Sequence, residues 1–371
     1  MSGLSDAERR AWLRLSRTQN VGPVTFAQLI ARFGSASEAL KEVPALAKRG
    51  GGGALRIPGD AEAGREIEAL AKLGGRMIAS CEPDYPRSLL AAEPAPPIIS
   101  MLGHATLLQR EMVAMVGARN ASALGRRLAG EMARELGAAG LIVVSGLARG
   151  IDGAAHEGSL ASGTVAVMAG GVDIVYPPEH DKLHARIREQ GAVVSEMPLG
   201  TQPQARHFPR RNRIVSGLAR GTVVIEAAEG SGSLITARFA LEQGREIFAV
   251  PGSPLDPRAK GTNRLIREGA TLTESAADVV EGLRPILGHD FREPGREPPL
   301  GPLFAPHSNH VAAEADRLRA KVEESLGPAP VAVDELVRLC GAPVGVILTI
   351  LLEMELAGRI VRHPGGQVSW A

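Results

Sequence analysis

Six short apolar runs between residues 112 and 250 dominate the pattern of hydrophobic and polar positions in this chain. They begin near residues 112, 141, 164, 192, 222 and 246, and segments of helix length separate them. Strand-length apolar runs that alternate with helices are typical of a parallel sheet covered on both faces. We therefore expect an α/β fold with a doubly wound, mostly parallel sheet, whose ligands bind beyond the carboxyl ends of the strands.

A small helical module precedes these runs. Residues 5–17 and 61–73 have helical patterns, and a turn at Gly22 and Pro23 separates further short helices between them. Helix, hairpin and helix is the outline of modules that hold DNA phosphates at a helix start. A single Gly-Pro pair is a weak signal, however, and we favour a plain helical bundle. The glycine run at residues 50–53 predicts a flexible loop.

After the sheet domain, the chain has a Pro-rich stretch and then a second region of helical patterns. Residues 288–310 contain five prolines and little apolar periodicity, as is typical of a linker. Helical patterns at residues 311–326, 333–340 and 343–357 then lead into two short strands around a Pro-Gly-Gly turn. Three helices and a β-hairpin predict a winged helix.

The charges of this winged helix argue against the reading of duplex DNA. Residues 311–371 hold six basic and eight acidic side chains. The third helix offers no Arg, Lys, Asn or Gln to a base edge, and it carries Glu353 and Glu355 instead. We therefore expect this domain to contact protein rather than a DNA groove.

These patterns divide the chain into four parts. We expect a helical domain at residues 1–75, SAM-like or helix-hairpin-helix-like, a sheet domain at 76–287, a Pro-rich linker at 288–310 and a winged-helix domain at 311–371. The Pro-rich residues 74–104 are expected to form a lead-in segment that lies against the sheet.

Composition narrows the class of protein. The net charge of +1 excludes a uniformly basic protein, so any attraction to nucleic acid must come from local clusters. The start of the chain has no apolar signal region and no run of 18 apolar residues occurs, so we expect a cytoplasmic protein without membrane contact. Cys81 and Cys340 are expected to be buried, inert thiols.

Signatures of catalysis are missing from the sequence. No lysine follows a glycine, so the phosphate-binding motif of P-loop hydrolases is absent, and the strand exits at residues 117 and 230 do not match G-x-G-x-x-G. No G-x-S-x-G elbow surrounds Ser145, and the histidines lack metal-ligand spacing. We predict no catalytic residue, no metal and no cofactor.

Anion-binding features remain. Arg119 and Ser122 follow the first strand at a helix start, and Ser231, Gly232 and Ser233 repeat that arrangement. We expect free backbone N–H groups there, which clamp phosphates together with hydroxyl and guanidinium groups. Taken alone, Ser122 is equally consistent with a plain N-cap and Arg119 with a surface charge. The sharper feature is residues 201–220, which hold five arginines and no acid, namely Arg206, Arg210, Arg211, Arg213 and Arg220. A solvated helix usually carries compensating Glu, so we favour a polyanion track, with His207, Phe208 and Tyr176 as stacking platforms nearby.

With these residues in view, the chain resembles the DNA-processing protein A (DprA/Smf) family over nearly its full length. The motifs that carry the resemblance are GARNAS at 117, VVSGLARGIDGAAHEGSL at 143, HFPRRNRIVSGLA at 207, EAAEGSGSLITARFALEQGREIFAVPGS at 226 and KGTNRLIREGA at 260. The resemblance implies a Rossmann-like centre and a cytosolic bacterial protein that binds single-stranded DNA. It also implies a homodimer that recruits the RecA recombinase during natural transformation, competence and homologous recombination, and that is not an enzyme.

The resemblance assigns DNA contacts as well. The family motif G-S-R-x-x-S maps onto Gly117, Arg119 and Ser122, with Ala118 in place of the usual Ser. The loop before Tyr176 resembles a second DNA-contacting region, whose basic residue stays open because Lys182 is the only nearby lysine. The full set of expected DNA-binding residues is Gly117, Arg119, Ser122, Gly146, Arg149, Gly171, Tyr176, Arg206, Arg210, Arg211, Arg213, Ser231, Gly232 and Ser233.

Two other functions stay open. The sheet also resembles lysine-decarboxylase-like nucleotide phosphoribohydrolases, but Thr236 stands where their P-G-G-x-G-T-x-x-E motif places the catalytic Glu, with Glu226 and Glu229 as substitutes. A transcription regulator that reads duplex DNA through the winged helix is the third candidate, which the acidic third helix weakens. For the dimer, we expect residues 238–268 to form the contact surface.

Overall fold

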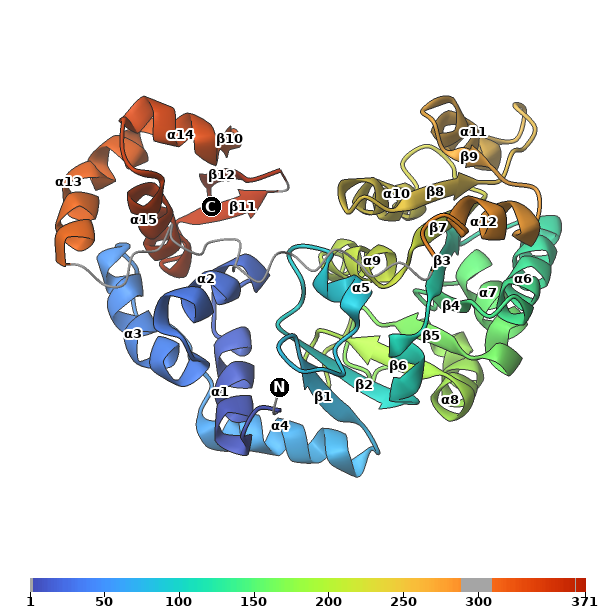
Figure 1. Ribbon diagram of the computed structural model, residues 1–371, viewed down its shortest axis with the longest axis horizontal. Coiled ribbons are helices and arrows are strands. Elements are labelled where there is room, and N and C mark those ends of the chain that lie inside the picture. The colour runs from blue at the N-terminus through green and yellow to red at the C-terminus, as the bar shows by residue number, and fades with distance from the viewer. Residues whose placement is uncertain (1–2, 288–308, 364) are drawn as a thin grey trace. The chain divides into compact units, whose positions relative to one another are not determined.

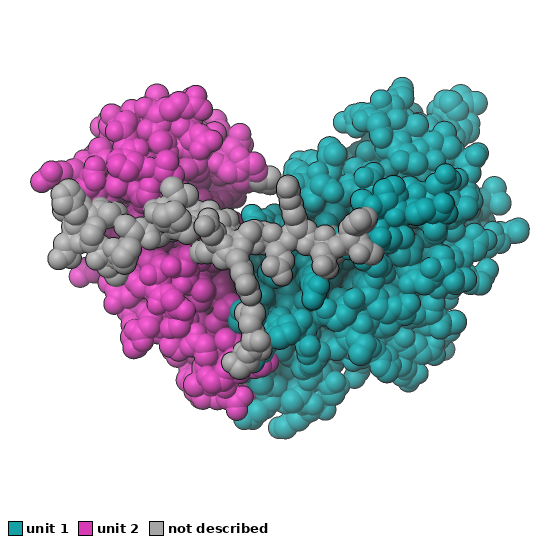
Figure 2. Space-filling view, viewed as in Figure 1, with its two compact units in different colours: residues 1–3, 66–293 teal, residues 4–65, 294–371 magenta. Residues whose placement is uncertain are grey.

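The computed structural model describes residues 3–287, 309–363 and 365–371. These residues fall into two compact units (Figure 2): residues 66–287 form the first, and residues 4–65 together with 309–371 form the second. The expected linker at 288–310 lies almost entirely outside the described residues. The two ends of the chain thus share one unit, although the sequence patterns present them as separate domains.

A nine-stranded mixed sheet forms the centre of the first unit (Figure 1), in the order β1-β2-β6-β5-β4-β3-β7-β8-β9. The strands are β1 Arg76–Ala79, β2 Ile98–Gly103, β3 Met112–Gly117, β4 Ile142–Ser145, β5 Thr164–Val167, β6 Ala192–Ser195, β7 Gly221–Ile225, β8 Glu246–Ala249 and β9 Thr271–Leu272. The strands from β6 to β9 in this order are parallel. All six predicted apolar runs are strands, and the predicted fold class is confirmed.

Helices cover both faces of this sheet because successive strand residues point to opposite sides. In β3, Ala114 and Val116 belong to one core cluster with residues of α9 and α10, whereas Val113 and Met115 belong to a second cluster with residues of α6, α7 and α12. The helices of this unit are α5 Arg87–Leu90, α6 Ala123–Ala138, α7 Ile151–Ser159, α8 Asp181–Gln190, α9 His207–Leu218, α10 Gly232–Glu242, α11 Lys260–Arg267 and α12 Ala276–Leu283.

The Pro-rich residues 74–104 are part of the sheet, so the predicted lead-in segment was wrong. They contain β1 and β2, and β2 pairs antiparallel with both β1 and β6. Five of the six residues of β2 are buried. The prolines obscured the pattern because they lie between the two strands, where they form the connection rather than the ladder.

The second unit combines a helical module with a winged helix. Its helices are α1 Asp6–Arg17, α2 Pro23–Phe33, α3 Ala36–Arg49, α13 Asn309–Ser325, α14 Val333–Cys340 and α15 Val344–Leu356, and the division between the units falls inside α4, Asp60–Lys72. The strands β10 Val331–Ala332, β11 Ile360–His363 and β12 Gln367–Trp370 form the wing, with β12 in the middle.

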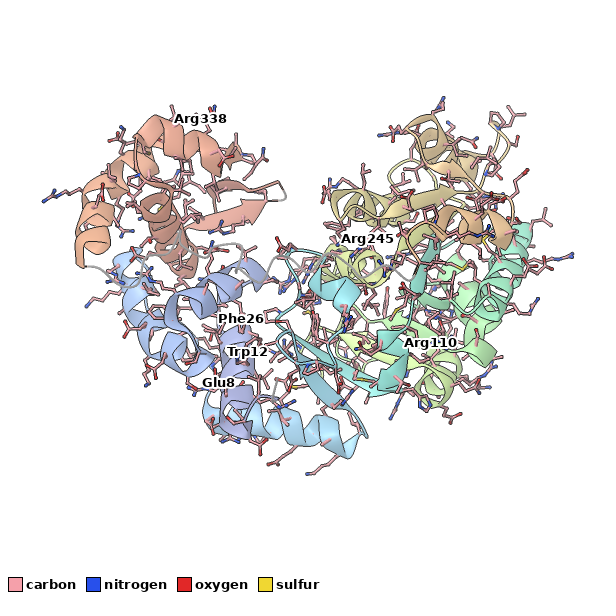
Figure 3. All side chains as sticks on the ribbon, in the orientation of Figure 1. Glu8, Trp12, Phe26, Arg110, Arg245 and Arg338 are labelled. Atoms are coloured by element: carbon pink, nitrogen blue, oxygen red, sulfur yellow. The ribbon has the colours of Figure 1, made fainter. Side chains whose placement is uncertain are left out.

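The helical module has its own aromatic contact and capping interactions. Trp12 and Phe26 meet edge to face with ring centroids 4.9 Å apart (Figure 3). The carboxylate of Glu8 accepts from the backbone N–H of Ala36 and the hydroxyl of Ser37, both at 2.6 Å, and so satisfies the start of α3. These contacts give α1, α2 and α3 a fixed mutual arrangement.

Two further expectations can be compared with the described residues. Cys340 is buried as expected, but Cys81 is exposed. Among the described residues, no single helix is long and apolar enough to cross a membrane, and the pair α14 and α15, which together reach that length, is bent by 118°.

Candidate nucleic-acid interface

A cleft of about 340 Å³ lies at the carboxyl ends of the parallel strands β3, β4 and β5. Ligands of open α/β sheets bind at this edge, because the loops that follow the strands present backbone groups and side chains there. Five predicted contact residues line the cleft, namely Arg119, Gly146, Arg149, Tyr176 and Arg211. The rest of the lining consists of Asn120, Ala148, Met168, Ala169, Gly170, Pro177 and Phe208.

Arg119, Phe208 and Tyr176 form a cluster of one cation and two aromatic rings in this cleft. The guanidinium carbon of Arg119 lies 5.0 Å from the centroid of the Phe208 ring, and the rings of Phe208 and Tyr176 are 5.8 Å apart. Arg119 is exposed, and Tyr176 retains 45% of its surface. The cation–π contact therefore holds the guanidinium in place while leaving it and the Tyr176 ring open to a ligand.

Arg211 forms a buried cationic wall of the cleft. It is 6% exposed, its guanidinium lies 3.9 Å from the carboxylate of Asp152, and its Nε has no hydrogen-bond partner. Burial lowers the pKa of Arg211, whereas the charge of Asp152 raises it. The Asp152 carboxylate also accepts from the backbone N–H groups of Gly146 and Ala148 at 3.1 and 3.4 Å. The guanidinium thus adds a fixed positive charge to the cleft lining, which suits an anionic ligand.

Gly146 allows Arg211 to occupy this position. A Cβ atom added at Gly146 would lie 1.2 Å from Nη1 of Arg211, so any side chain would displace the guanidinium. Glycine at the exit of β4 thus serves close packing rather than flexibility.

Arg149 is the second exposed arginine of the cleft. The resemblance left open which basic residue serves the second DNA-contacting region, and the position of Arg149 bears on that choice. Its Nε pairs with a carboxylate oxygen of Glu179, and its side chain is 62% exposed. Lys182 is not among the cleft residues. Arg149, unlike Lys182, therefore shares the cleft lining with Tyr176.

The arginines of residues 201–220 have different environments. Arg206 is exposed directly before α9, but Arg213 donates to the carbonyl oxygen of Pro94 at 2.7 Å and pairs with Glu196. Arg210 lies 3.5 Å from the same Glu196 carboxylate. The compensating acid that is missing from the local sequence therefore comes from the end of β6, and only Arg211 of this group lines the cleft.

The helix start at Ser122 is already occupied by an anion from the protein itself. Glu226, whose φ is 53°, places its carboxylate so that it accepts from the Ser122 hydroxyl at 2.5 Å and from the Ser122 N–H at 2.8 Å. The Ser122 hydroxyl also accepts from the Gly125 N–H at 2.8 Å as the N-cap of α6. The expectation of free N–H groups at this helix start is therefore wrong for Ser122.

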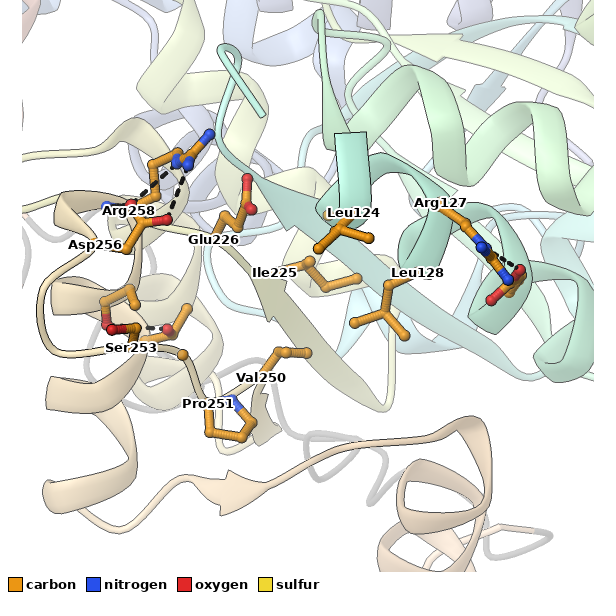
Figure 4. Close-up of a pocket in the computed structure, with 15 residues that line it drawn as sticks. Leu124, Arg127, Leu128, Ile225, Glu226, Val250, Pro251, Ser253, Asp256 and Arg258 are labelled. Atoms are coloured by element: carbon orange, nitrogen blue, oxygen red, sulfur yellow. Dashed lines mark hydrogen bonds and ion pairs between the residues drawn. The ribbon is translucent and has the colours of Figure 1, made fainter. Parts of the chain in front are cut away.

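Glu226 lines a separate pocket of about 360 Å³ between the ends of β7 and β8 and the start of α6. Figure 4 shows its carboxylate together with Leu124 and Arg258 in this pocket, where Arg258 is paired with Asp256. Gly117 fills a packing position beside it, since an added Cβ would lie 1.9 Å from the carbonyl oxygen of Ile225. The pocket is thus distinct from the Arg119 cleft.

The remaining predicted contacts lie outside the cleft lining. Ser231 caps α10, its hydroxyl lies 2.8 Å from that of Ser233, and the carbonyl of Gly232 accepts from the Asn212 side chain at 3.1 Å. The N–H of Gly171 donates to the carbonyl oxygen of Thr201 at 3.0 Å. Within the described residues, no group of three or more His, Cys, Asp or Glu side chains is arranged to hold a metal ion.

Sequence reasoning missed Asp152 and left Phe208 outside the set of expected contact residues. Phe208, which it treated only as a nearby platform, contacts the guanidinium groups of both Arg119 and Arg211. Its position three residues before Arg211 in one helix was the available signal. Asp152, the buried partner of Arg211, is 59 positions away along the chain and had no such signal.

The fold and the cleft together define a Rossmann-like protein whose strand edge offers guanidinium groups and aromatic rings to a ligand. Comparisons with known proteins identify the family: the chain belongs to the DNA recombination-mediator protein A family, also called DprA or Smf, whose model matches residues 76–284. Residues 6–69 match the DprA-like N-terminal HHH domain, an outline that we ranked second to a plain bundle, and residues 306–366 match the DprA winged helix domain.

Individual relatives agree with this assignment. The chain is 40% identical to Protein Smf of Escherichia coli K12 over 76% of this chain and 74% of that protein. It is 44% identical to the DNA processing protein DprA of Bacillus subtilis over 57% of this chain and 71% of that one. Among solved structures, DprA of Streptococcus pneumoniae superposes with a TM-score of 0.61 at 31% identity, covering 76% of this chain and 98% of that chain.

A second solved relative is DprA of Helicobacter pylori. It superposes with a TM-score of 0.52 at 26% identity, covering 57% of this chain and 96% of that chain. The structure is described as revealing the single-stranded DNA binding mode of that protein.

Proposed function

We propose that the cleft between Arg119, Arg211 and Tyr176 binds single-stranded DNA, and that the protein is a DNA-processing recombination mediator rather than an enzyme. The observation that carries the proposal is that one cleft is lined by the buried guanidinium of Arg211, two exposed arginines and two aromatic rings. The single-stranded DNA binding described for the H. pylori relative supports it.

The chemistry of each group suggests its part in binding. Arg119, Arg149 and Arg211 neutralise phosphates, and the exposed Tyr176 ring stacks on an unpaired base, as guanidinium and aromatic groups do in other single-strand-binding proteins. Every base has a π-face, so binding is tolerant of sequence. Charge neutralisation supplies most of the affinity, so binding weakens as salt rises.

The rest of the proposal concerns partners. We propose that the protein acts as a homodimer, protects incoming DNA and loads the RecA recombinase onto it during natural transformation. The family description as a recombination mediator and the name of the B. subtilis relative support this role. Residues 238–268 are the proposed dimer surface, where Leu241 and Leu255 are 69% and 92% exposed.

The nucleotide-hydrolase alternative has less support. Thr236, at the position of the catalytic Glu in those enzymes, is 2% exposed. Of the two substitutes, Glu226 is hydrogen-bonded to Ser122 at both carboxylate oxygens, which leaves Glu229 at an exposed turn. General acid catalysis needs a carboxyl group within reach of the glycosidic oxygen, which this arrangement does not favour.

Fluorescence anisotropy of a labelled oligonucleotide, single-stranded against duplex, tests the proposal. We expect the intact protein to prefer the single strand and its affinity to fall steeply across a salt series. A preference for duplex would instead move the function to the winged helix. Failure to bind either form would refute the DNA-binding role and direct attention to nucleoside monophosphates as substrates.

A further inference from the structure

In the third helix of the winged helix, α15, every residue from 346 to 354 is buried. Val346, Ile347, Ile350, Leu351 and Met354 face the core of the winged helix itself. The other side of the same helix is buried as well, with Leu352 and Leu356 fully covered and Leu348 8% exposed. Outside the winged helix, the elements packed against α15 are α2 and α3 of the N-terminal helical module. A helix that is apolar around its whole circumference requires such a second partner.

A buried carboxylate lies in the contact between α15 and α3. Glu353 is 2% exposed, its Oε1 lies 3.0 Å from Nε of Arg49 at the end of α3, and its Oε2 pairs with Arg319 of α13. Burial lowers the pKa of Arg32 on α2, and the charge of Glu353 opposes that shift. The charge of Glu353 is therefore balanced by both modules, and loss of either partner leaves a charge poorly compensated in the interior.

The glycine run at residues 50–53 makes this contact possible. A Cβ added at Gly50 would lie 1.9 Å from the carbonyl oxygen of Glu353, and one at Gly52 would lie 2.7 Å from Cα of Ala357. The run is a loop, as its composition predicts, and two of its glycines pack closely. At Gly50 and Gly52 the backbone approaches the carboxyl end of α15 more closely than a side chain would allow.

Two polar contacts across more than 300 residues complete the interface, and in one of them Nη1 of Arg359 donates to the carbonyl oxygen of Gly50 at 3.5 Å. The side-chain amide of Asn20 donates to the carbonyl oxygen of Leu356 at 3.0 Å, which satisfies one of the unpaired carbonyls at the end of α15. Arg359, just beyond α15, stacks over Trp370 of β12 and pairs with Glu323 of α13. The end of α15 is thus held from the helical module and from the winged helix together.

We infer that the outer face of α15, with which many winged helices read a DNA groove, is here the docking surface for the N-terminal helical module of the same chain. The two ends of the chain fold as one interdependent unit, and α15 does not enter duplex DNA. Winged and related helix-turn-helix domains need this helix exposed to reach base edges. Here Glu353 and the apolar residues beside it are committed to α3, independently of what the Arg119 cleft binds.

A pair of adjacent leucine substitutions in the full-length protein tests the inference. Gly52→Leu drives a side chain into Ala357, whereas Gly53→Leu is the matched control because a Cβ at Gly53 has no atom within 4 Å. We expect Gly52→Leu to raise amide hydrogen exchange of residues 344–356 by about tenfold or more, and Gly53→Leu to leave it at the wild-type rate. Single-stranded DNA affinity should stay unchanged in both variants. Equal exchange in the two variants would overturn the inference, as would protection of these amides by a short duplex in the wild-type protein.

A charge-based cycle provides the test if Gly52→Leu fails to fold. Arg49→Met should lower the melting temperature of the second unit by about 3 °C or more in the wild-type background, because it leaves the buried Glu353 with fewer partners. In a Glu353→Gln background the same substitution should have a much smaller effect. Equal shifts in both backgrounds would mean that the two residues are not coupled, which would refute the interface.

Discussion

Replacement of Arg119 by alanine removes one exposed guanidinium from the cleft and is the most direct test of the proposed DNA site. The side chain is held over Phe208 at 5.0 Å and forms no part of the sheet core, so we expect the fold to survive. A charge-assisted contact with phosphate is worth about 1.5–3 kcal/mol. Because Arg119 is exposed, the lower end applies, which corresponds to about a tenfold loss of affinity at low salt.

The salt dependence gives the more specific signature. Each phosphate contact on a single strand contributes about 0.7 to the slope of log affinity against log salt concentration. Loss of one contact should therefore shrink the ratio of wild-type to variant affinity about fivefold over a tenfold rise in salt. Anisotropy titrations at several salt concentrations measure both quantities. Arg119→Lys should keep the slope but lose affinity, because lysine lacks the planar group that stacks on Phe208.

Control measurements distinguish a direct contact between Arg119 and phosphate from a role of Arg119 in packing on Phe208. Arg76→Ala removes an arginine that is similarly exposed, is paired with Asp84 and is absent from the cleft lining, and we expect it to leave affinity and slope unchanged. A weaker Arg119→Ala variant with an unchanged slope would mean that Arg119 acts by packing on Phe208. An unchanged affinity would refute the assignment of this cleft.

Three further predictions concern other parts of the first unit. Gly146→Ala should displace the Arg211 guanidinium, and we expect a loss of single-strand affinity with an unchanged circular dichroism spectrum; unchanged affinity would show that Arg211 does not bind DNA. Burial lowers the pKa of His156 to about 3. As the pH falls below the pKa of this histidine in the unfolded chain, the unfolded chain binds a proton that the folded chain does not bind. The stability of the fold therefore decreases as the pH decreases. This residue should cost about 1.4 kcal/mol per pH unit between pH 6 and pH 4, a slope that denaturant melts of His156→Gln should lack. Leu241→Asp should reduce the mass found by light scattering to that of a monomer, and an unchanged dimer mass would exclude this surface.

The apolar pattern predicted most of the fold because it is a local property of the chain. Strands buried on both faces appear as short continuous apolar runs, and every such run from Met112 to Ala249 is a strand of the sheet. The winged helix was predicted in the same way, from three segments with helical periodicity and a Pro-Gly-Gly turn. The strands β1 and β2 were not predicted, because they are only four and six residues long and the stretch between them is rich in proline.

Part of the cleft also followed from local signals. The loops after β3, β4 and β5 contribute Arg119, Gly146 and Arg149, and parallel strands bring their carboxyl ends to one edge whatever their separation in sequence. The arginines of α9 showed the limit of this reasoning. Their spacing along the chain gave no way to distinguish Arg211, which faces the cleft, from Arg213, which is bound to Glu196 and Pro94.

The sequence by itself therefore determined the succession of strands and helices, the strand edge that carries the cleft and the arginine-rich composition of that edge. Tertiary structure alone decided which charges are available. It paired Arg211 with Asp152, filled the Ser122 helix start with Glu226 and placed Glu353 between the two ends of the chain. The physical reason is that periodicity depends on neighbours within a few residues, whereas the partner of a buried charge is set by packing between elements that are tens to hundreds of residues apart.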